Sequence, residues 1–138
     1  MMVSTRGRYS LRLMVDIAKQ GEAGTLISMR QAAERLDLSI KYLEQLGGAL
    51  VRGGVLKSVR GVNGGYHLAR PASQISIGEV LRATEGNCLM IPGLENEEEC
   101  ARREGPEATA FWLGMSDVLA KYMDGVSLAD VVAFGEGK

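Results

Sequence analysis

The chain has 138 residues, a formal net charge of -1 and 46% hydrophobic residues. This length and composition suit one globular domain with a modest core and exclude a chain that is disordered throughout. Because no apolar run approaches about 20 residues and the first residues lack the apolar stretch and cleavage site of a signal peptide, we expect a cytoplasmic protein with no membrane partner.

The first half of the chain predicts three helices. Apolar residues at helical spacing across residues 8–20 predict an amphipathic helix. Residues 28–31 form a capping-box pattern, which opens a short helix that ends near Leu36. Ser39 can cap the next helix, over about residues 40–52. Two short helices joined by a tight turn indicate a helix-turn-helix.

A β-ribbon is predicted after these helices. Residues 55–59 and 66–69 are short, β-prone and roughly alternating. The segment between them includes Asn63-Gly64, a dipeptide typical of hairpin turns. We therefore expect a wing with Arg60 at its tip. Three glycines are expected to shape the turn through positive φ angles: Gly61, Gly64 and Gly65.

A helix and an acidic loop are predicted next. A second capping-box pattern at residues 76–79 opens a helix through about Thr84. Over residues 85–106, glycines and prolines interrupt a stretch without hydrophobic period, so we expect an exposed loop. Both cysteines, Cys88 and Cys100, lie in this stretch. Their position predicts a sensor loop, because neither shows the periodicity of a core residue.

The last part of the chain predicts a long helix. Apolar side chains at helical spacing begin after residue 107, and Gly125 ends the helix. A short helix follows over about residues 127–134. The apolar stripe of the long helix is unfavourable in water, so we expect a second subunit to bury it. The stripe consists of Phe111, Met115, Val118, Leu119 and Tyr122.

Together these elements predict a mainly α fold with a small β-wing, as in a winged helix-turn-helix plus a long C-terminal dimerisation helix. Residues 1–72 form the expected winged helix DNA-binding domain. Residues 73–106 form the connecting helix and the acidic cysteine-containing sensor loop. Residues 107–138 form the dimerisation helices.

Candidate DNA contacts lie at the start of the second helix of the pair, because recognition helices reach base edges chiefly through their N-terminal residues. Gln45 can pair with adenine, Glu44 can accept from cytosine N4, and Lys41 suits phosphate or guanine. A solvated helix face is the alternative interpretation, but the neighbouring wing favours DNA. The candidates on this helix are Ser39, Lys41, Tyr42, Glu44 and Gln45.

The wing adds a second candidate contact. Arg60 is flanked by Gly61, and its planar guanidinium suits a narrow minor groove, where the negative potential is enhanced. An ordinary surface arginine is the alternative interpretation. Three other basic residues are expected to contact phosphates, which position a protein without specifying sequence: Arg6, Arg8 and Lys57.

The distribution of charge favours a nucleic-acid partner. Residues 1–70 hold eleven Lys or Arg and five Asp or Glu, a net charge of +6, whereas residues 71–138 hold five and twelve, a net charge of -7. This asymmetry predicts that only the first half meets a polyanion, although chance clustering is the alternative. It also weighs against a winged helix that binds only other proteins. No catalytic constellation is visible, and the lone His67 suits a sheet surface, so we do not expect an enzyme.

The chain resembles the Rrf family of bacterial winged-helix transcription regulators. The resemblance spans almost the whole chain, and its most specific motifs are LSIKYLEQL at residues 38–46 and SVRGVNGGY at residues 58–66. Further matches are STRGRY at residues 4–9, IGEV at 77–80, Trp112 and SLAD at 127–130. The resemblance implies a homodimer that binds a pseudo-palindromic operator in double-stranded DNA. It also implies that the helix after residue 107 forms the dimer interface.

The resemblance further implies an iron–sulfur cluster, because sensors of this family carry three cysteines before the long helix. Counted back from Trp112, the last of these positions falls at Pro106, which cannot be a ligand. The middle position falls at Cys100, and Cys88 serves as the first only if the loop is longer than usual. A fourth ligand, histidine in some members, would fall near Thr109.

Three interpretations of the two cysteines stay open. The interpretation that we favour is a [2Fe–2S] cluster, which they can hold if carboxylates or a residue of a partner subunit complete the ligand set. They can sense oxidation directly as a thiol pair. They can also be inert, in a cluster-free regulator controlled by a partner protein or a small ligand, as in some family members. We therefore expect a dimeric transcription regulator, a repressor, that senses redox or iron–sulfur status through Cys88 and Cys100. The carboxylates near the cysteines are Glu97, Glu98, Glu99 and Glu104.

Overall fold

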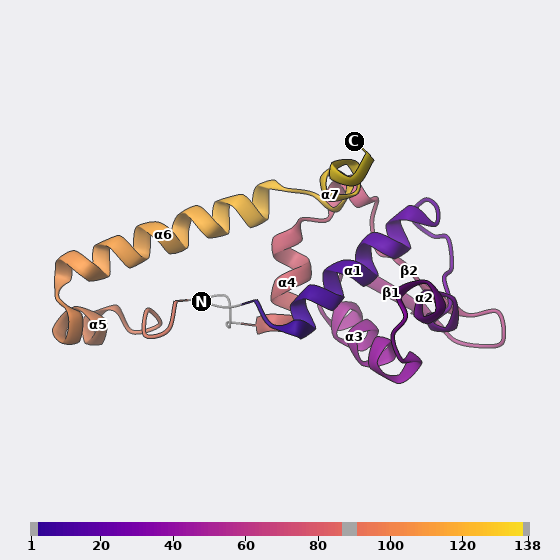
Figure 1. Ribbon diagram of the computed structural model, residues 1–138, viewed down its shortest axis with the longest axis horizontal. Helices are drawn as coiled ribbons and strands as arrows, with labels where there is room; N and C mark the ends of the chain where they lie inside the picture. Colours follow the sequence, from indigo (N-terminus) through magenta and orange to yellow (C-terminus); the bar gives the residue numbers. More distant parts are fainter. Residues whose placement is uncertain (1–2, 87–90, 137–138) are drawn as a thin grey trace.

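A computed structural model describes residues 3–86 and 91–136. Figure 1 shows a body made of the first four α-helices, the β-ribbon and the last helix, from which one long helix projects with a short helix at its far end. The elements in chain order are α1 (Thr5–Lys19), α2 (Met29–Leu36), α3 (Ile40–Arg52), β1 (Leu56–Val59), β2 (Gly65–Leu68), the 3-10 helix η1 (Ala72–Gln74), α4 (Ile77–Glu85), α5 (Glu97–Glu104), α6 (Pro106–Gly125) and α7 (Leu128–Glu136). None of these described helices is both long and apolar enough to cross a membrane. The order of these elements confirms the predicted mainly α fold with a small β-wing.

Serine caps set the start of five helices. Ser4, Ser28, Ser39, Ser76 and Ser127 each accept a hydrogen bond from a backbone N–H three residues later. The reciprocal bond of a capping box is present at Ser28, Ser76 and Ser127, and the sequence predicts the first two boxes. Helix α1 begins at Thr5, three residues before its predicted start, because the Ser4 hydroxyl caps it.

One hydrophobic core joins the helix-turn-helix to α4 and α7. Leu13, Met14 and Ile17 of α1 are buried in it, as are Leu43, Leu46 and Leu50 of α3. Val80 of α4 and Leu128 of α7 are fully buried with them. Each such side chain contributes roughly 1.5–3 kcal/mol through burial. The Leu128 N–H also donates to the Ile75 carbonyl at 2.8 Å. The chain therefore returns to the body after α6, and α7 helps to hold α1 and η1 in place.

The wing is a two-stranded antiparallel sheet tied to the start of α2. Strand β1 pairs with β2 in the register Leu56 with Leu68 and Val59 with Gly65. On the other side of β2, Ile27 and Tyr66 exchange two backbone hydrogen bonds of 2.8 Å. The wing and the entry to α2 consequently form one unit.

The predicted role of the wing glycines is correct for Gly61 and wrong for the other two. Gly61 has a φ of 115°, whereas Gly64 and Gly65 do not adopt positive φ. A Cβ atom at Gly64 would lie 2.0 Å from the Val59 carbonyl oxygen, and one at Gly65 would lie 2.6 Å from the Ile27 carbonyl oxygen. These two glycines are therefore required by close backbone approach, which a dipeptide pattern does not show.

The exposed loop predicted over residues 85–106 is partly wrong, because this stretch contains α5. The Asn96 side chain caps α5 by accepting from the Glu99 N–H at 3.1 Å. Three glutamates in its first turn and two arginines in its last turn suit the helix dipole. Charge and capping specify this helix, so a search for apolar periodicity misses it. Cys100 on α5 is buried, contrary to the prediction that it lies exposed, and Cys88 lies outside the described residues.

Candidate nucleic-acid interface

A groove separates the first turns of α3 from the wing. In Figure 1 the loop between β1 and β2 projects from the end of the body opposite to α5. The walls of the groove come from three elements, namely α2, α3 and the wing. Residues that line it include Arg30, Ile40, Glu44, Ser58, Arg60 and Gly61. The structure thus brings together Glu44, Arg60 and Gly61 of the predicted DNA contacts.

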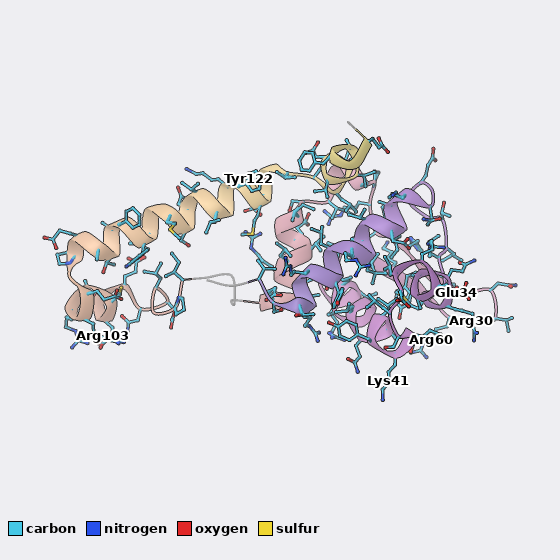
Figure 2. The ribbon with its side chains drawn as sticks, in the orientation of Figure 1. Arg30, Glu34, Lys41, Arg60, Arg103 and Tyr122 are labelled. Carbon is cyan, nitrogen blue, oxygen red and sulfur yellow. The ribbon has the colours of Figure 1, made fainter. Side chains whose placement is uncertain are left out.

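On α3, three of the five predicted contacts are exposed and free to reach a ligand. Lys41, Glu44 and Gln45 are exposed and share one face, since residues three and four apart are neighbours on a helix. Figure 2 shows Lys41 projecting from α3 away from the body. The Ser39 hydroxyl already accepts from the Tyr42 N–H at 3.0 Å, so Ser39 acts as a cap.

Tyr42 has a packing role on the inner side of α3. It is half-buried, and its ring lies edge-on to Tyr9 of α1 with 5.9 Å between ring centroids. The Arg12 guanidinium lies over the Tyr9 ring and donates to the Leu36 carbonyl at 3.2 Å. This cluster joins α1, the end of α2 and α3, and it sets the angle at which α3 leaves the turn.

On the wing, Arg60 is exposed directly after β1. The most exposed point of the loop is Val62, whose relative exposure is 102%, so Arg60 lies at the shoulder of the wing. Sequence reasoning missed Val62, although its place midway between the two strands was a signal. The Gly64 N–H donates to the Gly61 carbonyl at 3.0 Å, which closes the turn around Val62.

The three predicted phosphate contacts lie outside the groove. Lys57 pairs with His67, on the face of the ribbon opposite to Ser58, since side chains alternate along a strand. Arg6 and Arg8 are exposed on the first turns of α1. Their role as phosphate contacts thus stays a prediction about the flanks of the interface.

Arg30 is a groove residue that sequence reasoning missed. It is exposed as the second residue of α2, two residues after the Ser28 cap, and it lines the groove with Arg60. Its position at the start of the first helix of the helix-turn-helix was the available signal. Within residues 3–86 and 91–136, no ion pair engages Arg30, Lys41 or Arg60. Their positive charges are therefore available to a polyanion.

A second candidate site surrounds Cys100, where α5 packs on α6. The Cys100 side chain is 4% exposed. The Thr109 hydroxyl contacts its sulfur at 3.2 Å, and the sulfur lies 3.5 Å from Oε2 of Glu104. Sequence counting placed a fourth cluster ligand near Thr109, and the structure does bring Thr109 to Cys100.

The donors around Cys100 do not fit an iron–sulfur cluster. Among residues 3–86 and 91–136 they comprise one thiol, one hydroxyl and one carboxylate, whereas such clusters prefer four thiolates or histidine in place of some of them. Pro106 occupies the expected third position and begins α6. In the described part of the chain, no three His, Cys, Asp or Glu residues are grouped to hold a metal ion.

The predicted interface stripe runs along the projecting helix α6. Phe111, Met115, Val118 and Tyr122 have relative exposures of 64%, 41%, 66% and 64%. Their spacing of three and four residues places them on one face. Leu119 is half-buried at the edge of this face. An apolar face of this kind is costly in water unless another surface covers it.

Comparisons with known proteins agree with this geometry. A family model, Rrf2, described as an iron-dependent transcriptional regulator, matches residues 3–133. The HTH-type transcriptional regulator CymR of Bacillus subtilis (strain 168) is 36% identical over 139 residues, with 100% of this chain and 94% of CymR covered. The HTH-type transcriptional regulator IscR of Escherichia coli (strain K12 / DH10B) is 33% identical over 137 residues, with 96% of this chain and 80% of IscR covered.

Solved structures show the same similarity. The structure of CymR (YrzC), the global cysteine regulator of B. subtilis, matches with a TM-score of 0.77 and 34% identity, covering 97% of this chain and 98% of CymR. The oxidized form of Staphylococcus aureus CymR matches with a TM-score of 0.74 and 38% identity, covering 96% of each chain. These relatives are regulators of transcription, not enzymes.

Proposed function

Because the chain belongs to the Rrf2 family of transcriptional regulators, we propose that it is a dimeric repressor that reads its operator with α3 and the wing. The observation that carries this proposal is the groove between α3 and the wing, which Arg60 lines with no ion pair among the described residues. Helix α3 and the wing lie on either side of this protein groove. One of them can therefore enter a major groove of the duplex while the other enters the adjacent minor groove.

Helix α3 reads base edges in a major groove. Its exposed face presents an amide, a carboxylate and an ammonium at Gln45, Glu44 and Lys41. Gln45 can form two hydrogen bonds with adenine, and Glu44 can accept from cytosine N4. Arg60 then reaches the adjacent minor groove, where narrow A·T-rich sequence concentrates negative potential. Val62 beside it supplies an apolar contact at the tip of the wing.

A two-fold dimer covers the apolar face of α6. The support is the row of exposed apolar side chains on a helix that projects from the body (Figure 1). In a dimer, two winged helices are presented together, and the operator is a pseudo-palindrome whose half-sites are about one helical turn apart. Repression follows when such a dimer occupies a promoter.

The signal enters through the packing of α5 on α6, and it is a thiol signal that needs no cluster. Cys100 is buried in that packing beside Thr109 and Glu104. Oxidation by a peroxide transfers one oxygen to the thiolate, breaks the O–O bond and releases hydroxide or water. The added polar oxygen separates α5 from α6, because the sulfur is buried where the two helices pack and contacts Thr109 of α6. The oxidized form of the relative from S. aureus supports this chemistry.

Sequence recognition is tested by measuring binding to an operator that the wild-type protein has selected from random duplexes. We expect Arg60→Ala to weaken binding by roughly 1–3 kcal/mol and to relax sequence preference beside the α3 site, because a minor-groove contact is lost. Gln45→Ala relaxes preference at one base step. Arg103→Ala removes the same charge from α5, at the far end of the molecule (Figure 2), and serves as the matched control. Wild-type affinity and preference in both Arg60→Ala and Gln45→Ala would contradict the proposed function.

A further inference from the structure

The groove between α3 and the wing lies where one strand of a bound duplex has to pass. If α3 occupies a major groove and Arg60 the adjacent minor groove, the sugar–phosphate backbone that divides those grooves runs between α3 and the wing. This path of the DNA backbone, and the inference drawn from it, rest on the proposed function of α3 and Arg60.

Two polar side chains of the groove are available for a phosphate. Arg30 comes from α2, and Ser58 comes from β1. Both are exposed, and within the described residues neither side chain makes an ion pair or a hydrogen bond with another protein group. Ser58 pairs with Tyr66 in the sheet, which sets its place on the ribbon. The two side chains therefore line one channel and have no competing partner.

Backbone contacts fix the position of Arg30 relative to Ser58. Ile27, just before α2, exchanges two hydrogen bonds of 2.8 Å with Tyr66 of β2. Gly65 permits this approach, because a Cβ atom there would lie 2.6 Å from the Ile27 carbonyl oxygen. The start of α2 is thus attached directly to the wing. These backbone hydrogen bonds hold the start of α2 and the wing at a fixed distance from each other, independently of side-chain packing.

We propose that this groove is a phosphate channel, in which the Arg30 guanidinium and the Ser58 hydroxyl bind a phosphodiester of the strand that passes between α3 and the wing. A guanidinium matches the geometry of a phosphate with two parallel N–H donors. A serine hydroxyl donates a further hydrogen bond to a phosphate oxygen. Contacts of this kind set the register of α3 and Arg60 on the duplex but read no sequence.

The negative charge of Glu44 in the same groove favours binding of the phosphate at the opposite wall. Its carboxylate extends from α3 and repels a phosphodiester, whereas Arg30 attracts it from the side of α2. The strand is therefore held toward α2 and the wing, and Glu44 is left to face the bases. Arg60 follows β1 on the same ribbon as Ser58, so one short segment both holds the strand and enters the minor groove.

The first test measures operator affinity against salt concentration, with the selected operator as the probe. Because a dimer presents two copies of Arg30 to one operator, Arg30→Ala is expected to reduce the magnitude of the slope of log K against log salt by about 1.8, so that its affinity loss is about twelvefold larger at 50 mM than at 200 mM salt. Arg30→Lys restores the slope because it keeps the charge. Ser58→Ala lowers affinity several-fold with an unchanged slope, since a hydroxyl carries no charge. Arg103→Ala is the control and behaves as wild type.

The second test replaces single phosphates of the same operator by neutral methylphosphonates. One position in each half-site, on the strand between the α3 site and the Arg60 site, is expected to weaken wild-type binding but to have little further effect on Arg30→Ala. Non-additivity at that position supports the channel, because it shows that both changes remove one contact. Additive losses at every position, or a wild-type salt slope in Arg30→Ala, overturn it. If Arg60→Ala still weakens binding in that case, the proposed function stands without the channel. If the wild-type protein selects no operator from random duplexes, both the phosphate channel and the proposed function are contradicted.

Discussion

The contact between Thr109 and Cys100 shows that residues of a neighbouring helix determine the environment of the Cys100 thiol. Thr109 is 5% exposed, and its hydroxyl lies 3.2 Å from the Cys100 sulfur and 2.8 Å from the Gly105 carbonyl oxygen. The cysteine is therefore an interior residue of a two-helix contact. Buried cysteines react slowly unless their surroundings open. In the proposed thiol signal, the reaction of Cys100 therefore depends on the packing of α5 against α6 as well as on the oxidant.

At the scale of the residue, we predict that Cys100 carries the sensitivity to oxidant. Peroxide treatment is expected to weaken operator binding by the wild-type protein, and a thiol reductant should restore it, because a sulfenic acid is reversible. Cys100→Ala is expected to bind operator equally before and after treatment. A shift assay at constant salt measures these affinities.

Cys88→Ala is the matched control for this prediction and is expected to keep the response to peroxide. Equal responses in Cys100→Ala and the wild type would contradict the role of Cys100. Protein purified without oxygen is also expected to be colourless. Visible absorption with stoichiometric iron and sulfide, lost in Cys100→Ala, would show a cluster in place of the thiol.

At the scale of the element, one bidentate ion pair joins α4 to the end of α6. The Arg82 guanidinium donates to both carboxylate oxygens of Asp124, at 2.7 and 3.0 Å. Gly78 leaves room for this pair, because a Cβ atom there would lie 2.1 Å from Oδ1 of Asp124. The pair acts where the projecting helix leaves the body, so it restrains the direction of α6. Arg82 lowers the pKa of Asp124, chiefly through its hydrogen bonds.

We predict that Asp124→Asn lowers the free energy of unfolding by up to about 1 kcal/mol near pH 6, since half-exposed pairs contribute little. A carboxyl group whose folded-state pKa is lowered stabilises the fold above its unfolded-state pKa, and this contribution is lost as the pH falls through the folded-state pKa. The ordinary pKa of aspartic acid is 3.8. The difference between wild type and Asp124→Asn should therefore shrink below about pH 4.

Urea unfolding at pH 6 and at pH 3 measures this difference. Asp117→Asn is the control, because Asp117 pairs with Lys121 within α6 and joins no second element. A stability difference for Asp124→Asn that is the same at both pH values would show that the charge of Asp124 is not the cause.

At the scale of the whole molecule, the shape of the chain is itself an argument for a partner copy. Helix α6 has 20 residues, which corresponds to a length of about 30 Å. It extends from the body with α5 at its far end and carries large apolar side chains on an exposed face (Figure 1). A second copy with the same face can cover it by a self-complementary contact around a two-fold axis. Both winged helices would then be available to one duplex.

We predict that Met115→Glu produces monomers, because a buried carboxylate without a partner opposes association. The dimer dissociation constant is expected to rise by at least about 100-fold, and operator binding should be lost at the concentrations at which wild type binds. Sedimentation equilibrium and a shift assay on the same samples measure the two effects.

Lys121→Glu is the matched control for assembly. It adds a negative charge on α6 at a side chain that is 78% exposed and lies on the face that carries Asp117, away from the apolar stripe. This variant is expected to remain dimeric. A wild-type protein that sediments as a monomer at micromolar concentration would contradict the proposed assembly.

The sequence by itself determined the features that depend on residues close together in the chain. Serine caps such as Ser28 and Ser76, and apolar spacing such as that of Leu43, Leu46 and Leu50, specify helices through hydrogen bonds and faces within one or two turns. The motifs of the recognition helix and wing were enough to predict the fold and the family. The stripe on α6 was also visible, because helical periodicity is a local property.

Only the tertiary structure decided which groups meet across the chain. Arg30 joins Arg60 in one groove because Ile27 pairs with Tyr66, and Gly65 is needed for that approach. Cys100 is buried because α5 folds against α6, although no apolar periodicity marks α5. Contacts of this kind depend on the path of the backbone between distant elements, and a local pattern carries no record of that path.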